Sequence, residues 1–154
     1  MKRLTQSGAA FGAAFTLTAA LAVIAPAGAE TVHPAKMDSE DQTGKIFENP
    51  GTVVTQTGDD YILDFTSMLS SDGRFASGMY TAPASRSEIN EPYGVDEFMY
   101  FLEGGVTLTS SDGTVTEIEA GDAVTIPKEW TGVWETDGYR KIWVIYSEDG
   151  SALE

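Results

Sequence analysis

The feature that most constrains the fold is a run of four short strand-like segments, punctuated by glycine, at residues 93–134. One fragment reads DEFMYFLEGG, in which six residues separate Glu97 from Gly104, and a later fragment reads GDAVTIP. Between them, two segments rich in valine and threonine are joined by Asp112 and Gly113. An Asp-Gly pair between such segments favours a β-hairpin, because glycine tolerates the positive φ of a tight turn. The run therefore predicts strand, glycine turn, strand, Asp-Gly turn, strand, Gly-Asp turn and strand, as the central meander of a small barrel.

The rest of the chain also favours β-structure. Tyr61, Leu63 and Phe65 alternate with Ile62 and Asp64, which places three large apolar side chains on one face of a strand. Further Asp-Gly pairs begin at positions 72 and 137, and no segment has a sustained helical period. Short strands separated by regular turns indicate an all-β sandwich or barrel. The chain has no cysteine, so no disulfide contributes to its stability.

The two spaced fragments resemble the two motifs of the cupin superfamily. Over residues 78–146 the chain more closely resembles the cupin domain of ureidoglycine aminohydrolase-like proteins. The residues that carry the resemblance are Asp96-Glu97-Phe98, Tyr100, Leu102-Glu103-Gly104, Gly121-Asp122-Ala123, Ile126-Pro127 and Arg140-Lys141. This resemblance implies a single-domain cupin-type β-barrel, which is a double-sheet jelly roll. It implies much less about activity, because one fold hosts many functions.

Cupins that bind a metal carry two histidines shortly before the glutamate of the first motif, and a third five residues after the proline of the second. Here these places hold Asn90 and Pro92 or Glu91 and Tyr93 upstream, and Gly132 downstream. Only Glu97 remains of the four usual ligands. One carboxylate does not hold a first-row metal ion tightly. We therefore expect no metal ion and no other cofactor.

The N-terminal segment, residues 1–29, has the layout of a secretory signal peptide. Lys2 and Arg3 precede an apolar stretch, and Ala27-Gly28-Ala29 is a small-residue cleavage site. A retained membrane anchor is the alternative. We interpret residues 30–50 as an N-terminal arm, in which residues 45–47 add a strand or cover a sheet edge, and residues 51–154 as the barrel. The predicted location is the periplasm or the medium.

The charge of the chain limits its partners. Of nine basic residues, two lie in the predicted signal segment, which leaves seven against 24 acidic residues and a formal charge of −17. Nucleic acids and anionic lipids are bound through lysine and arginine contacts to phosphate. We therefore expect no nucleic-acid partner and no membrane partner.

Two segments, residues 98–102 and 142–146, are apolar at nearly every position. Such a strand is typically covered on both faces. In a single barrel the outer cover comes from the N-terminal arm or from a second copy, so a homodimer is one of two open possibilities.

Strand alternation places Glu97 on the same face as Met99 and Phe101, toward the barrel interior. An unpaired acid there would have a raised pKa and could serve acid–base chemistry or hold a polar ligand. The alternative is a structural pair with an arginine of the barrel, such as Arg86 or Arg140. Both interpretations stay open at this point.

The other candidate ligand-binding residues are Met99 and Arg86, together with four aromatic or acidic residues. Trp130 and Trp134 flank Gly132. Their rings could stack on a ligand, or they could fill the space that a metal site would occupy. Tyr93 and Glu91 could stand beside Glu97, but these oxygens are too few for a Ca²⁺ or Mg²⁺ site. The only histidine, His33, lies in the predicted arm and is a poor catalytic candidate.

Three functions are compatible with these residues. The preferred one is an exported cupin that binds a small polar or ring-bearing organic molecule without a transition metal. The second is an aminohydrolase-like or isomerase-like enzyme that uses Glu97 as its catalytic acid and base, with a substituted metal site. The third is a structural dimerising module whose barrel is filled. An open cavity lined by Glu97, Trp134 and Tyr93 would favour the first two.

The predicted signal peptide is directly testable. Because residues 27–29 satisfy the small-residue rule for cleavage, protein exported by its native host should begin at Glu30. Intact mass spectrometry measures this, and a mass that retains residues 1–29 would refute it.

Overall fold

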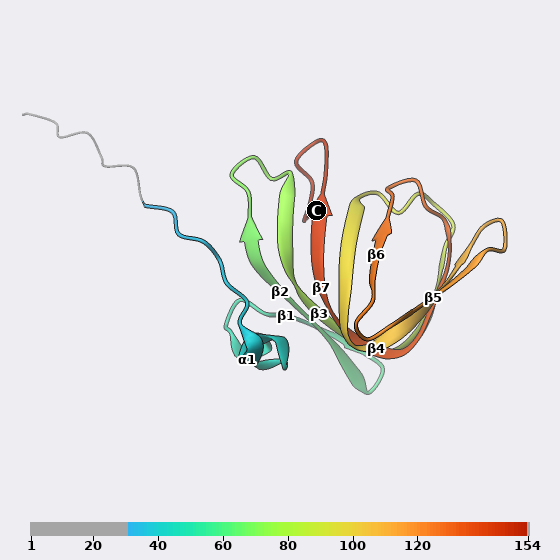
Figure 1. Cartoon of the computed structure of the whole chain (residues 1–154), viewed down its shortest axis with the longest axis horizontal. Coiled ribbons are helices and arrows are strands. Elements are labelled where there is room, and N and C mark those ends of the chain that lie inside the picture. The colour runs from blue at the N-terminus through green and yellow to red at the C-terminus, as the bar shows by residue number, and fades with distance from the viewer. Residues whose placement is uncertain (1–30, 154) are drawn as a thin grey trace, which may run out of the picture. The chain divides into compact units, whose positions relative to one another are not determined.

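The computed structural model describes residues 31–153, so the predicted signal segment lies outside the described residues. Seven antiparallel strands form one sheet in the order β1-β2-β3-β7-β4-β5, and β6 pairs with β4 (Figure 1). The strands are β1 Val53–Thr57, β2 Asp60–Leu69, β3 Phe75–Ile89, β4 Asp96–Ser110, β5 Val115–Glu119, β6 Ala123–Ile126 and β7 Gly132–Tyr146. The expected all-β class is confirmed. In this part of the chain, no helix has the length and apolar character needed to span a membrane.

The predicted meander is present with one difference, at Gly104. This glycine does not end a strand, because β4 continues through it and bends where its register with β7 shifts. The first half of β4 pairs with β6 and the second half with β5. Gly104 has φ 66°, and a Cβ there would lie 1.9 Å from the carbonyl oxygen of Gly138. Glycine is therefore required, for a bulge within a strand rather than for a turn.

The inner face of the sheet forms the core. Met99 pairs with Trp143 and Phe101 pairs with Lys141, and all four side chains are buried. Trp143 also lies against Gly78 of β3, where a Cβ would be 2.5 Å from the indole ring. The absence of a side chain at Gly78 lets this ring pack flat on the sheet.

The N-terminal arm covers the other face of the sheet at β2. It contains a short helix α1, Ser39–Gln42, and a 3₁₀ turn η1, Lys45–Glu48, which contacts β2. Gly51 lies against the ring of Phe65, and Ile46 is buried. Residues 45–47 thus form a 3₁₀ turn over a face rather than an added strand.

This placement explains the alternation seen in β2. Leu63 and Phe65 are half-buried, and Phe65 lies under the arm. Ile62 and Asp64 point to the other face and line the cavity described below. Leu63 and Phe65 of β2 therefore lie on the face of the sheet that the N-terminal arm covers.

The described residues leave part of the outer face of the sheet uncovered. Phe75, Phe98, Tyr100 and Tyr146 are between 38% and 47% exposed. Pairing places Phe75 beside Tyr146, and Phe98 and Tyr100 beside Val144 and Ile142, so they share one face of β3, β7 and β4. We call these four residues the outer aromatic patch. Residues 31–153 cover the inner face of residues 98–102 and 142–146 and leave part of the outer face exposed, so the predicted cover by a second copy stays a prediction.

Candidate functional site

A cavity of about 540 Å³ opens on the inner face of the sheet. Its wall comes from β1, β2, β3, β4 and β7, together with the segment before β4 and residues near the C-terminus. Glu97, Tyr93 and Trp134 all line it, which is the arrangement expected for the binding and enzyme functions. The volume falls within the range of ordinary small-molecule sites, which is roughly 300–1,000 Å³.

Glu97 is held by two donors on the cavity wall. The Lys141 ammonium donates from Nζ to Glu97 Oε1 at 2.7 Å, and the Tyr93 hydroxyl donates to Glu97 Oε2. The Lys141 and Glu97 side chains are only 6% and 5% exposed. Each carboxylate oxygen therefore has a donor of its own, and the charges of the pair are shielded from water.

The partner of Glu97 follows from the alternation of β7. Lys141 points inward, whereas its neighbour Arg140 points outward and pairs with Glu103 at 2.5 Å. Arg86 is exposed on β3 and pairs with Glu88 and, at 3.8 Å, with Glu135. Glu97 therefore has a cationic partner, as one of the two open interpretations supposed, but the cation is Lys141, because the guanidinium groups of Arg86 and Arg140 lie outside the cavity.

Aromatic rings surround the Lys141 ammonium. Its Nζ lies 5.2 Å from the ring centroid of Trp134, 5.5 Å from that of Tyr80 and 5.7 Å from that of Tyr139. Tyr80 and Tyr139 stack at 6.0 Å. At these distances the ring faces attract a cation, and they keep water away from it.

A second carboxylate, that of Asp64 on β2, lines the same cavity. Its Oδ1 accepts a hydrogen bond of 3.1 Å from the Trp143 indole. Among the residues that the structure describes, no cation lies within salt-bridge distance of Asp64. Two carboxylates and one ammonium thus give the cavity an excess of negative charge.

Burial shifts the acid–base behaviour of these groups. It lowers the pKa of the Lys141 ammonium, while the Glu97 carboxylate opposes that shift. Burial likewise raises the pKa of Asp64, against the hydrogen bond from Trp143. The pKa of the Tyr93 phenol is raised far above its usual range by burial and by the charge of Glu97. Tyr93 therefore keeps its proton and acts as a donor.

The cavity residues do not fit a transition metal. Both oxygens of Glu97 already accept hydrogen bonds, and the adjacent ammonium repels a cation. Within residues 31–153, no three histidine, cysteine, aspartate or glutamate side chains are grouped to hold a metal ion.

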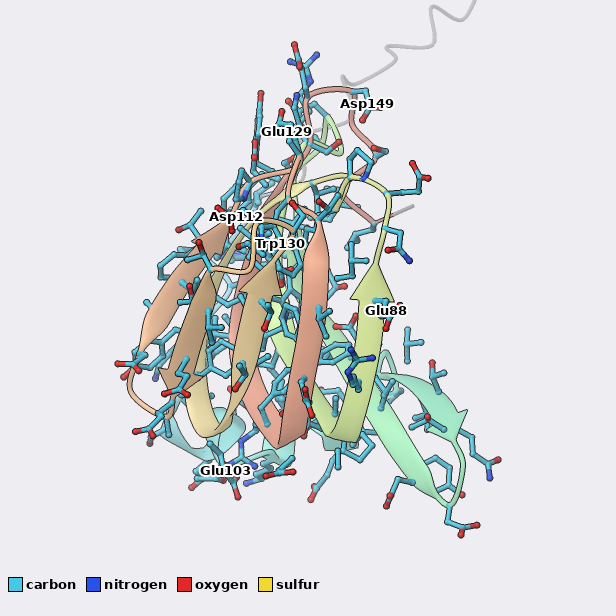
Figure 2. The ribbon with its side chains drawn as sticks, turned by 90° about the vertical axis from the view of Figure 1, so that its right-hand side faces the viewer. Glu88, Glu103, Asp112, Glu129, Trp130 and Asp149 are labelled. Atoms are coloured by element: carbon cyan, nitrogen blue, oxygen red, sulfur yellow. The ribbon has the colours of Figure 1, made fainter. Side chains whose placement is uncertain are left out.

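The remaining predicted site residues lie outside the cavity wall. Met99 is fully buried behind it, with Sδ 2.9 Å from Lys141 Nζ. Trp130 packs edge-on against Tyr93 and donates to Ser110, and Figure 2 shows it toward the end of the strands opposite Glu103. Glu91 is exposed and does not line the cavity, and neither does Arg86. Glu88, the partner of Arg86, is also exposed (Figure 2).

Sequence reasoning missed five residues that shape the site. Lys141 belonged to the family resemblance but was given no role, and the others had no motif at all. Strand alternation could have identified part of this set, because residues 139, 141 and 143 lie on the same face of one strand. The missed residues are Asp64, Tyr80, Tyr139, Lys141 and Trp143.

Comparisons with known proteins identify the fold. Residues 69–142 match the family model described as the EutQ-like cupin domain. The EutQ protein of Clostridium difficile is 22% identical, with a TM-score of 0.49 over 62% of this chain and 77% of that one. A protein of unknown function from Pseudomonas syringae is 16% identical, with a TM-score of 0.55 over 61% of this chain and 43% of that one. A putative ethanolamine utilization protein from Salmonella typhimurium is 18% identical, with a TM-score of 0.49 over 64% and 95%.

At these identities the structural similarities show the fold alone. The argument for the fold uses the Pseudomonas structure, of which the matched region covers 43%. The fold is a cupin β-barrel, and the predicted jelly roll is confirmed. Within it, residues 69–142 are similar to the EutQ-like cupin domain. No protein of curated function matches the sequence.

The buried pair gives a stability prediction. Lys141→Met or Glu97→Leu removes one charge and leaves the other buried alone, which should lower the free energy of unfolding by about 3–5 kcal/mol. The double variant should recover most of that loss, because it leaves no buried charge. Urea denaturation of the four proteins measures this.

Lys45→Met is the matched control, because the pair between Lys45 and Glu40 is exposed and should contribute little. If Lys141→Met were as stable as the parent protein, the buried pair would not exist in solution.

Proposed function

We propose that this chain is an exported cupin-domain protein that binds a small ring-bearing organic molecule with polar groups, without a transition metal. The observation that carries the proposal is the open cavity, whose wall combines aromatic rings with the Tyr93–Glu97–Lys141 cluster. A mostly apolar wall with a few convergent polar groups is typical of ligand sites. An open cavity also argues against the filled-barrel alternative.

The aromatic wall favours a ring. Tyr80, Trp134 and Tyr139 present large flat surfaces, and stacking on such surfaces contributes about 0.5–1.5 kcal/mol beyond the area buried. Within the described part of the chain, the hydroxyls of Tyr80 and Tyr139 have no hydrogen-bond partner. They are therefore available to polar substituents on the ring.

The charge of the site favours a neutral or cationic ligand. Asp64 lines the cavity and forms no salt bridge within residues 31–153. The whole chain carries a formal charge of −15, which repels anions at longer range. An amine or a neutral polar group near Asp64 therefore fits better than a carboxylate.

The enzyme alternative rests on the position of Glu97. A buried carboxylate between an amine and a phenol can pass a proton to or from a bound substrate. This favours the aminohydrolase-like or isomerase-like function implied by the closer family resemblance, with Glu97 as the catalytic acid and base. Binding in the cavity is common to both functions, so the binding experiment comes first.

Three probes that share one ring test the proposed site. Benzylamine and benzyl alcohol should raise the melting temperature of the tag-free mature protein and quench tryptophan fluorescence, whereas benzoate should not. Asp64→Asn should weaken benzylamine about tenfold or more, because a hydrogen bond to a charged group contributes about 1.5–3 kcal/mol. Because the proposed site contains no transition metal, treatment with EDTA should leave the affinities for benzylamine and benzyl alcohol unchanged.

Glu88→Gln is the control for charge, since it removes a surface carboxylate outside the cavity. Trp134→Leu should weaken benzylamine and benzyl alcohol alike, because both lose the same ring. A stronger interaction with benzoate than with benzylamine would contradict the charge argument. The absence of binding by all three probes would count against the cavity as a site for simple ring ligands.

The outer aromatic patch supports a second proposal, a homodimer. Single soluble chains rarely expose a continuous apolar surface of this kind, and the described arm covers β2 instead. A second copy of the chain offers the same patch, so a two-fold contact is self-complementary. We infer that the two outer faces pack together.

Light scattering coupled to gel filtration tests the dimer. The mature protein should have the mass of two chains, and Tyr100→Lys should reduce it to one, because the ammonium would be buried in the interface. Val54→Lys is the matched control, since Val54 is exposed on β1 outside the patch. A single-chain mass for the unmodified protein at its highest soluble concentration would rule the dimer out.

A further inference from the structure

The amine of Lys141 has surroundings that its role in an ion pair does not require. It belongs to the cavity wall, yet its side chain is only 6% exposed. An ion pair alone would be equally well formed at the surface, as the pair between Lys45 and Glu40 is. Here the amine instead stands where a molecule bound in the cavity would meet it.

The neighbours of Lys141 match the needs of a nucleophilic amine. Lysine attacks a carbonyl group only as the neutral amine, and desolvation in an aromatic pocket favours that form. Burial accordingly lowers the pKa of Lys141. Glu97 Oε1, at 2.7 Å, is positioned to receive the proton that the ammonium must release.

We propose that Lys141 forms a reversible imine with a ring-bearing aldehyde or ketone held in the cavity. This inference rests on the proposed function, because the same cavity must first bind the ring. It adds a reactive group to the ligand class, namely a carbonyl carbon that reaches Nζ.

The reaction balances with the groups present. Lys141 passes a proton to Glu97, and the nitrogen lone pair forms a bond to the carbonyl carbon. The carbonyl π electrons move to its oxygen, which takes a proton from the nitrogen to give a neutral carbinolamine. Glu97 then protonates the hydroxyl, water leaves, and the nitrogen lone pair forms the C=N bond of a protonated imine. The net change is an ammonium and a carbonyl compound giving a protonated imine and one water.

The product retains the electrostatics of the starting site. A protonated imine carries the same single positive charge as the ammonium, so Glu97 remains paired. The rings of Tyr80, Trp134 and Tyr139 still face a cation. The reaction therefore leaves no buried charge unpaired, which would otherwise be its largest energetic obstacle.

Reductive trapping tests the proposal on the mature protein. Benzaldehyde with sodium cyanoborohydride at neutral pH converts an imine into a stable benzyl amine, which intact mass and peptide mapping locate. Lys141 should be labelled about tenfold faster or more than Lys36, Lys45 and Lys128, which are exposed. The lowered pKa of Lys141 gives it a larger neutral fraction than an exposed lysine has at the same pH. Benzyl alcohol, which has the same ring and no carbonyl, should slow labelling at Lys141 and not at Lys45.

Variants separate reactivity from folding. Lys141→Arg keeps the positive charge and should lose the adduct at this position, while labelling of Lys45 is unchanged. Glu97→Gln removes the acid that protonates the departing hydroxyl, so imine formation should slow even though loss of the carboxylate favours the neutral amine of Lys141. Should either variant fail to fold, the competition by benzyl alcohol on the unmodified protein still decides the matter.

The outcomes distinguish this inference from the binding proposal beneath it. If benzyl alcohol raises the melting temperature but adducts form only at exposed lysines, the imine is overturned and the binding site stands. If neither probe raises the melting temperature and Lys141 stays unlabelled, both proposals fail. Preferential labelling at Lys141 that benzyl alcohol suppresses supports both.

Discussion

The buried pair between Lys141 and Glu97 is the interaction on which the cavity depends. Removing two charges from water is unfavourable by several kcal/mol for each ion, and a single contact seldom offsets it. Here the 2.7 Å contact is supplemented by the Tyr93 hydroxyl on the second carboxylate oxygen, and by three rings around the ammonium. Three rings of the cavity wall thus contact the same nitrogen atom, Lys141 Nζ. The ion pair places polar groups at one position in a wall that also contains aromatic rings.

The register of β7 keeps that nitrogen inside. Arg140 and Lys141 are adjacent, so one points to Glu103 on the outer face and the other to Glu97 within. A slip of one residue would exchange them and would move Trp143 out of the core. Pairing with β3 along one edge and β4 along the other prevents this slip. The close approaches at Gly78 and Gly104 allow those pairings, since a side chain at either place would meet neighbouring atoms.

The sequence predicted the fold better than the site, for a physical reason. Glycine spacing and strand alternation are local, so they identified the meander and the inward-facing positions of Glu97 and Trp134. The bend at Gly104 was mistaken for a turn, because a positive φ serves both a turn and a bulge. Tyr93, four residues before Glu97, was among its predicted neighbours, whereas Lys141 lies 44 positions further along the chain. Asp64 joins them from β2 through Trp143, at a separation of 79 residues. No local pattern encodes such meetings, which depend on which strands pair.

The ammonium of Lys141 recognises a ligand in a different way from a metal ion. An ammonium presents N–H donors at fixed length, so it recognises an acceptor oxygen by hydrogen bonding. One N–H is directed to Glu97 and another lies near Met99 Sδ, which leaves donor capacity toward the cavity. Its nitrogen can also form a bond to carbon, provided that a nearby base holds the released proton. Glu97 supplies that base as well as the countercharge, so recognition and reactivity converge on the same pair of side chains.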